Sequence, residues 1–391
     1  MKRNLWEEIL VHEYRVWQQE PPSEVIKPLH EASPAFPAPA WVEQYLREQV
    51  EMLSGGENTV IFDDAGIPSI MVRLPLTRAC DLLEGETSDI PHPAFRLGER
   101  ELPEIWVGKY LTSLCQGIPA SLPMAQPQRY RRFDEAAQAA RSKGRCWQLM
   151  PYQVRMVLAL SSLQKGTLPG GNNEKGHDFF SKEEQGELAG DEFLVRTGSG
   201  SARWSHNGMP GGVWDLNGNL NEWEAGLRLV NGEIQIEDMQ ALCYDDKPWS
   251  EHSSSWKALD TAGQPVTPGG AQTLHYEPCP GGIRLMIGPG SMDMGNCAFQ
   301  DILVGEGVTP NCELKMWGLV PPNPAEKQVL GWRWVFPQGE ALPLSGGAYL
   351  AVDHAGIFFT GLTKPRYTDY HLGGMRLIYI DPKHLKESDL R

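Results

Sequence analysis

Residues 211–223 read Gly-Gly-Val-Trp-Asp-Leu-Asn-Gly-Asn-Leu-Asn-Glu-Trp and form the most informative stretch of the chain. Two tryptophans, Trp214 and Trp223, enclose a run that is rich in amide and carboxylate side chains. Such a turn offers many oxygen atoms, and calcium is bound by several oxygen ligands that include backbone carbonyls. The alternative is an Asn-Gly turn whose side chains bond to their own backbone. The residues alone leave both interpretations open.

The composition predicts a globular, acidic and loop-rich protein. The chain has 391 residues, of which 41% are hydrophobic and 22% charged, with 41 glycines and 31 prolines. Its 35 basic and 50 acidic residues give a net charge of −15, which repels the phosphates of nucleic acid. No apolar stretch is long enough to span a membrane, and residues 1–22 lack the apolar block of a signal peptide. We therefore expect no nucleic-acid partner, no membrane insertion and no signal peptide.

Several common kinds of functional site have no support in the sequence. The seven cysteines are scattered and never form a C-x-x-C pair, so we expect buried, reduced thiols and not a zinc ribbon or a disulfide framework. The glycine-rich runs at 170–173 and 198–201 lack the frames of phosphate and dinucleotide loops. The histidines lack H-E-x-x-H spacing, and no G-x-S-x-G sequence is present.

The first part of the chain predicts a small module. Helical patterns lie around residues 5–14 and 41–53. Residues 58–75 predict a β-hairpin whose tight turn contains Gly66. We interpret residues 1–99 as an attachment or oligomerisation module.

The rest of the chain predicts a second, larger unit. Residues 103–111 predict its opening strand, and residues 133–141 and 151–165 predict two packed helices. Short strands separated by turn residues follow, so the predicted class is α+β. We place this domain at 100–381 and a C-terminal tail at 382–391.

Residues 212–223 resemble the signature of the formylglycine-generating enzyme, or sulfatase-modifying factor, family, whose usual form is G-[VL]-x-D-x-x-G-N-V-x-E-W. Cys-Trp-Gln-Leu-Met-Pro at 146–151 also matches, and Ser-Gly-Gly at 345–347 with the later Gly-Met-Arg at 374–376 is similar to the closing R-G-G-[SN]-W … G-F-R. The resemblance covers roughly residues 100–381. It implies a C-type-lectin-like fold with irregular loops.

Within that family, the chain is most similar to the variable proteins of diversity-generating retroelements, which include phage tail proteins. The shared features are Leu-Val-Pro-Pro at 319–322 and the C-terminal segment. This segment departs from the family pattern at Ser345, Tyr349 and Val352, where the family has Arg, Trp and Gly. The resemblance implies a variable ligand-binding segment at about 332–380.

The resemblance favours a binding protein over an enzyme. Catalytic members bind copper through a pair of cysteines near their C-terminal strands, and copper(I) prefers such thiolate ligands. The last cysteine here is Cys312, so residues 313–391 carry no thiol. The related iron-dependent sulfoxide synthases need an H-x-x-x-H-x-E set, for which His12 has no companions. The alternatives are an oxidoreductase of the formylglycine-generating type and a lectin of fixed carbohydrate specificity.

The composition of residues 348–372 agrees with a variable segment. An asparagine codon that is randomised at its adenines cannot yield Glu, Gln, Lys, Met or Trp, and Lys364 is the only such residue in this range. Tyrosines there offer rigid contact area at a small entropic cost. We expect Trp332 and Trp334 to be buried, and Ile357, Phe358, Leu362 and Arg376 to belong to the core. The expected binding residues are Arg333, Ala348, Tyr349, Leu350, Ala351, Asp353, His354, Phe359, Thr363, Lys364, Tyr367, Thr368, Asp369, Tyr370, His371 and Leu372.

The resemblance also implies a structural calcium ion in the amide-rich turn. Its ligands would be the side chains of Asn217 and Glu222 and the carbonyls of Gly218 and Leu220. We expect a non-catalytic receptor-binding protein of a phage or prophage tail tip, found in the virion or, before assembly, in the bacterial cytoplasm. Its expected partners are a host cell-surface protein or glycan, other tail proteins and further copies of itself, because avidity compensates for weak individual sites.

Overall fold

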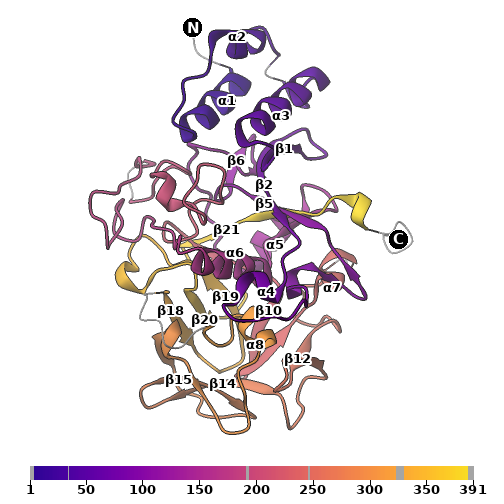
Figure 1. Ribbon diagram of the computed structural model, residues 1–391, viewed down its shortest axis with the longest axis vertical. Coiled ribbons are helices and arrows are strands. Elements are labelled where there is room, and N and C mark those ends of the chain that lie inside the picture. Colours follow the sequence, from indigo (N-terminus) through magenta and orange to yellow (C-terminus); the bar gives the residue numbers. More distant parts are fainter. Residues whose placement is uncertain (1–3, 34, 191–192, 245–246, 323–329, 386–391) are drawn as a thin grey trace.

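The computed structural model describes residues 4–33, 35–190, 193–244, 247–322 and 330–385. These residues form a mixed α+β protein, the class that the sequence predicts. Its strands form a five-stranded sheet and a larger branched sheet (Figure 1). The end of the predicted tail, at 386–391, lies outside the described residues. No helix within the described ranges is both long and apolar enough to cross a lipid bilayer.

Three helices, α1 (Leu5–Val16), α2 (Ser23–Ile26) and α3 (Ala40–Ser54), form one end of the molecule (Figure 1). The side chain of Asn4 caps α1 by accepting a hydrogen bond from the Glu7 backbone N–H. The chain leaves α3 at Gly55, which has a left-handed conformation. The apolar sides of α1 and α3 share one hydrophobic cluster.

The predicted hairpin forms, but it belongs to a sheet that is shared with distant parts of the chain. The order of this antiparallel sheet is β1-β2-β5-β22-β8. A division at residue 99 would cut through this sheet between β2 and β5, so the hairpin is structurally part of the larger unit. The strands are β1 (Asn58–Phe62), β2 (Pro68–Pro75), β5 (Glu104–Gly108), β8 (Trp147–Leu149) and β22 (Leu377–Tyr379).

Both helices predicted inside the larger unit are present. They are α5 (Phe133–Arg141) and α6 (Tyr152–Gln164), and Pro151 takes the N-cap position of α6 instead of its first turn. Almost every side chain of α6 is buried, because the helix crosses the middle of the molecule between the two sheets (Figure 1). The shorter helices are α4 (Ala79–Leu82), α7 (Met239–Tyr244) and α8 (Cys312–Met316).

The larger sheet has the main path β16-β18-β20-β19-β10-β11-β14-β15-β17, with β9, β12, β13 and β21 as branches. Strand β18 is parallel to β20, and β9 is parallel to β21. The second of these pairings brings the amide-rich turn beside the closing segment of the chain. The strands are β9 (Asn221–Trp223), β10 (Leu227–Val230), β11 (Glu233–Ile236), β12 (Lys257–Leu259), β13 (Pro265–Val266), β14 (Leu274–Cys279), β15 (Gly282–Ile287), β16 (Gly295–Ala298), β17 (Leu303–Val304), β18 (Trp332–Val335), β19 (Glu340–Ser345), β20 (Thr360–Lys364) and β21 (Gly373–Met375). Two small hairpins lie outside both sheets, β3 (Arg96–Leu97) with β4 (Arg100–Glu101) and β6 (Ser113–Cys115) with β7 (Ile118–Ala120).

A buried ion pair fixes α1 to the rest of the protein. Glu13 on α1 accepts hydrogen bonds from the ammonium of Lys109 and, at 2.9 Å, from the hydroxyl of Tyr110. All three side chains are fully buried. A buried charge needs a partner in such surroundings, so this contact specifies where the N-terminal helices dock.

We expect Glu13→Gln to lower the free energy of unfolding by about 3–5 kcal/mol, because it leaves the Lys109 ammonium buried without a counter-charge. Urea denaturation followed by tryptophan fluorescence would measure the change. The control is Glu8→Gln on the exposed side of the same helix, which should change the stability by less than about 0.5 kcal/mol. Equal effects of the two substitutions would contradict the assignment.

Candidate functional site

The amide-rich stretch at 211–223 lies in the interior and is held by charged side chains from other elements. Glu222 accepts two hydrogen bonds from Arg376, at 2.9 and 3.0 Å, and its Oε1 lies 3.1 Å from Nη2 of Arg155. The three side chains are almost completely buried. The carboxylate of Glu222 is therefore neutralised by two guanidinium groups.

The asparagines of the turn bond to a neighbouring loop. Asn217 donates to the carbonyl of Pro169 at 2.8 Å and accepts from the side chain of Asn173 at 3.2 Å. Gly218 has a φ of 80°, and a Cβ added there would lie 2.1 Å from the carbonyl oxygen of Asn172. The glycine is required because the two loops touch at this point.

The predicted calcium site does not fit this arrangement. Two buried guanidiniums beside the Glu222 carboxylate repel a divalent cation, and both polar atoms of the Asn217 side chain already have protein partners. The hydrogen bonds cross between loops, so the turn is not satisfied by its own backbone either. The four residues concerned are Asn217, Gly218, Leu220 and Glu222.

We expect the unfolding temperature of the metal-free protein to be the same with and without added calcium. Glu222→Gln should in contrast lower the free energy of unfolding by about 3–5 kcal/mol, because it removes the negative charge that two buried arginines share. Differential scanning calorimetry measures both effects, with Glu183→Gln on the surface as the matched control. Stabilisation by calcium that the Glu222 variant loses would restore the calcium hypothesis.

Asp215, in the same stretch, is a buried carboxyl group with few hydrogen-bond partners among the described residues. Its Oδ2 accepts from the Gly198 backbone N–H at 3.0 Å, while Oδ1 has no hydrogen-bond partner among the described residues. Burial raises the pKa of Asp215 to about 6, although the Gly198 N–H and the charge of Arg376 act in the opposite direction. The protonated form is therefore favoured in the folded state up to mildly acidic pH.

We expect Asp215→Asn to become more stable relative to the parent protein as the pH rises from about 4 through 6. In the parent protein the Asp215 carboxyl loses its proton near pH 4 when unfolded and near pH 6 when folded, so a rising pH destabilises the parent across this window. Above pH 6 the loss of stability reaches about 3 kcal/mol. Urea denaturation of both proteins at pH 4.5 and 7.5 measures the difference. A difference that is independent of pH would contradict the burial argument.

The backbone of the expected binding segment is anchored at its start. The backbone N–H of Lys175 donates to the Tyr349 carbonyl at 2.8 Å, and that of Val352 donates to the Asn173 carbonyl at 2.9 Å. The predicted core positions Ile357, Phe358, Leu362 and Arg376 are buried, which confirms their assignment. The segment thus has a fixed frame.

The expected binding residues divide into three groups by exposure. Tyr367 is 76% exposed and Leu350 is 50% exposed, so both project into solvent. Five residues are exposed: Leu350, Asp353, Tyr367, Asp369 and His371. Seven are half-buried: Ala351, His354, Phe359, Thr363, Lys364, Thr368 and Tyr370. Four are buried: Arg333, Ala348, Tyr349 and Leu372.

The orientation of β18 is the reverse of the expected one. Arg333 points into the core, where Nη2 donates to the Tyr152 hydroxyl at 3.0 Å and to the Gly318 carbonyl at 2.9 Å. Trp332 and Trp334 are half-buried on the other side of the strand. Side chains alternate along a strand, so the inward Arg333 requires the two tryptophans to point outward.

The outward tryptophans form an aromatic group that the sequence interpretation missed. The rings of Trp332 and Trp334 are 6.3 Å apart, and the His354 ring lies 4.1 Å from the first and 5.9 Å from the second. All three side chains are partly accessible. We call these three residues the tryptophan face, and it extends the candidate site onto the sheet.

Tyr349 and Leu372 are buried because a distant loop covers them. They share a hydrophobic cluster with Ala189, Leu194 and neighbouring residues. The Tyr349 ring lies 6.2 Å from that of Phe193, which is itself exposed. Phe193 therefore belongs to the accessible surface, and no local sequence signal identifies it.

Tyr370 has a mixed environment. Its hydroxyl accepts a hydrogen bond from the Asn221 side chain at 2.6 Å, and burial raises its pKa. The flanking residues, Asp369 and His371, are exposed, and Asp369 lies 3.4 Å from the guanidinium of Arg131. The loop presents polar side chains on both sides of a tyrosine that is anchored to the turn.

Burial keeps the thiols of Cys115 and Cys243 protonated, which disfavours reactions that need a thiolate. Burial raises the pKa of Cys243 to about 12 and that of Cys115 to about 11. All seven cysteines are free, as the sequence predicts, but only Cys115, Cys243 and Cys297 are buried, and Cys80 is exposed. Thiolate is the form that binds copper and attacks substrates, so neither buried group is poised for either role at neutral pH.

Comparisons with known proteins give little further information. No family model matches the chain, and no curated protein matches it. Among solved structures, the chain is similar to one titled "Major Tropism Determinant U1 Variant", with a TM-score of 0.30 and 12% identity. The match covers 80% of this chain and 63% of that chain, so it spans less than two thirds of the other protein. A likeness at this level assigns neither a family nor a function.

Proposed function

We propose that the protein is a non-catalytic receptor-binding protein with a C-type-lectin-like domain, carried on the tail tip of a phage or prophage. The observation that carries the proposal is the division of residues 348–376 into buried framework side chains and exposed side chains between them. The similarity of this segment to the variable proteins of diversity-generating retroelements supports the same assignment. The ligand would be a protein or glycan of the host cell surface.

The geometry suits recognition by interchangeable side chains. The backbone is held by hydrogen bonds to Asn173 and Lys175 and by the pairing of β21 with β9. Leu350, Tyr367 and His371 project from this frame without contributing to the core. A preorganised backbone lowers the entropic cost of association, and tyrosine offers a large contact area with few rotatable bonds.

The N-terminal helices suit a role in attachment or oligomerisation. They lie at one end of the molecule (Figure 1) and are fixed to the rest by the buried Glu13–Lys109 pair. Several copies on one particle would give avidity from weak individual sites. Other tail proteins and further copies of this chain are the partners that we propose for this end.

Simple experiments distinguish this proposal from two alternative functions. An oxidoreductase of the formylglycine-generating type would convert the cysteine of a C-x-P-x-R peptide to an aldehyde in the presence of copper and oxygen. A lectin of fixed specificity would give one sharp signal on a glycan array and would lack a variable-region template in its genome. A near-identical template copy of the codons for about 332–380, differing at adenines and lying beside a reverse-transcriptase gene, would support the diversified receptor-binding protein.

We expect the combined variant Leu350→Ala, Tyr367→Ala, His371→Ala to unfold within about 1 kcal/mol of the parent, because these side chains are exposed. Tyr349→Ala should lower the free energy of unfolding by about 3–5 kcal/mol, because its ring is buried. Urea denaturation measures both. Binding of labelled protein to a panel of intact bacterial strains should be lost in the combined variant. Retained binding, or strong destabilisation by the combined variant, would contradict the proposal.

A further inference from the structure

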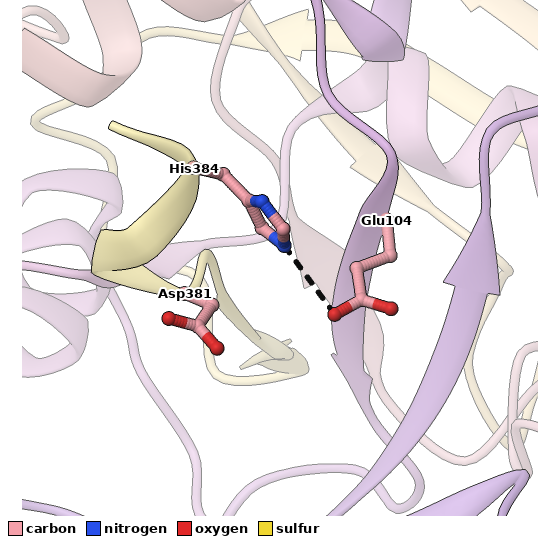
Figure 2. Close-up of side chains that lie close together, drawn as sticks. All are labelled: Glu104, Asp381 and His384. Carbon is pink, nitrogen blue, oxygen red and sulfur yellow. Dashed lines mark hydrogen bonds and ion pairs between the residues drawn. The ribbon is translucent and has the colours of Figure 1, made fainter. Parts of the chain in front are cut away.

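A second cluster of polar side chains lies away from the candidate binding surface, at the C-terminal end of the described chain. Glu104 is the first residue of β5, Asp381 caps the short helical turn η6 (Pro382–His384) that follows β22, and His384 is the last residue of that turn (Figure 2). One ligand atom from each of the three residues lies within 4.8 Å of the others. His384 Nε2 is 3.4 Å from Glu104 Oε1.

The sheet itself brings these residues together. Strands β5 and β22 are antiparallel neighbours, with Trp106 opposite Tyr379. Glu104 lies two residues before Trp106, and Asp381 lies two residues after Tyr379, just past the end of β22. Their proximity therefore follows from the register of the five-stranded sheet and does not depend on a chance contact between loops.

Two contacts orient the carboxylates. Glu104 Oε2 accepts from Arg73 Nε at 2.7 Å, which leaves Oε1 directed toward His384. Asp381 Oδ1 accepts from the Lys383 backbone N–H at 3.0 Å and so caps the turn. The other oxygen, Oδ2, contacts the ammonium of Lys383, and one of the two Asp381 oxygens faces Glu104 (Figure 2).

A positive charge already occupies this space. The ammonium of Lys383 lies 2.8 Å from Asp381 Oδ2 and 3.4 Å from Glu104 Oε1, so it bridges the two carboxylates. The Lys383 side chain is 60% exposed, whereas those of Glu104 and His384 are largely buried. A lysine of this kind can rotate into solvent and leave its place to another cation.

We propose that Glu104, Asp381 and His384 bind one divalent transition-metal ion, for which zinc is the best fit, and that Lys383 is the cation it displaces. Imidazole with carboxylate oxygens is a ligand set for zinc, while calcium and magnesium prefer oxygen alone. Bonds of about 2.0–2.2 Å to zinc bring neighbouring donors to roughly 3.3 Å of each other, so the side chains close by small rotations. Water completes the coordination.

A metal ion at this place clamps the end of the chain to the sheet. Glu104 lies in β5, and the other two ligands follow β22, so the ion would join two strands that are far apart in sequence. An ion that binds only the folded protein raises its stability. The site would therefore secure β22, the strand that continues from the buried Arg376.

The test is isothermal titration calorimetry of the full chain with zinc chloride, with calcium chloride as the comparison. We expect one zinc ion per chain, removable by EDTA, and no comparable binding of calcium. His384→Ala and Asp381→Asn should weaken zinc binding more than roughly tenfold. His371→Ala, which removes an exposed histidine outside the cluster, should bind zinc as the parent does.

Lys383→Ala separates this proposal from adventitious binding. Removing the competing ammonium should tighten zinc binding by roughly tenfold, because it deletes a positive charge a few ångströms from the ion. The zinc-dependent rise in unfolding temperature should also increase in this variant and disappear in His384→Ala. Absence of zinc binding, unchanged binding in His384→Ala, or unchanged binding in Lys383→Ala would each overturn the proposal.

Discussion

The buried charge network around Glu222 is the constraint on which the architecture depends. Arg376 and Arg155 converge on this carboxylate, and Arg155 also pairs with Glu224, whose other oxygen accepts from the Ser345 hydroxyl at 2.7 Å. Charges buried this deeply are tolerated only when every partner is present. The network therefore joins α6, the amide-rich turn, β19 and the end of β21 in one arrangement.

This constraint has a direct consequence for the candidate binding surface. The network fixes Ser345 at one end of the segment and Arg376 at the other, so the intervening chain is a long connection with both ends immobile. Apolar side chains such as Ile357, Phe358 and Leu362 fill the core, while Leu350, Tyr367 and His371 face solvent. Exposed side chains between fixed ends can be replaced without disturbing the network, which is the property that a variable recognition surface needs.

The sequence predicted correctly those features that depend on residues close together in the chain. The helix at 133–141 was predicted with its observed limits, and the hairpin and the framework positions Phe358 and Leu362 were also predicted correctly. The candidate site was predicted only in part, since five of its sixteen residues are exposed, seven are half-buried and four are buried. The tryptophan face and Phe193 were missed, because strand pairing and a distant loop decide their exposure.

The sequence by itself determined the α+β class, the hairpin at 58–75 and the core positions Ile357, Phe358, Leu362 and Arg376, because periodicity and turn chemistry are local properties. Only the tertiary structure decided that Arg333 faces inward and that Tyr349 is covered. It also decided that Glu222 bonds to Arg376, 154 residues away, in an arrangement that does not fit a calcium ion. The face that a strand presents and the charge that meets a carboxylate depend on which distant segments pack together, and no local pattern records that pairing.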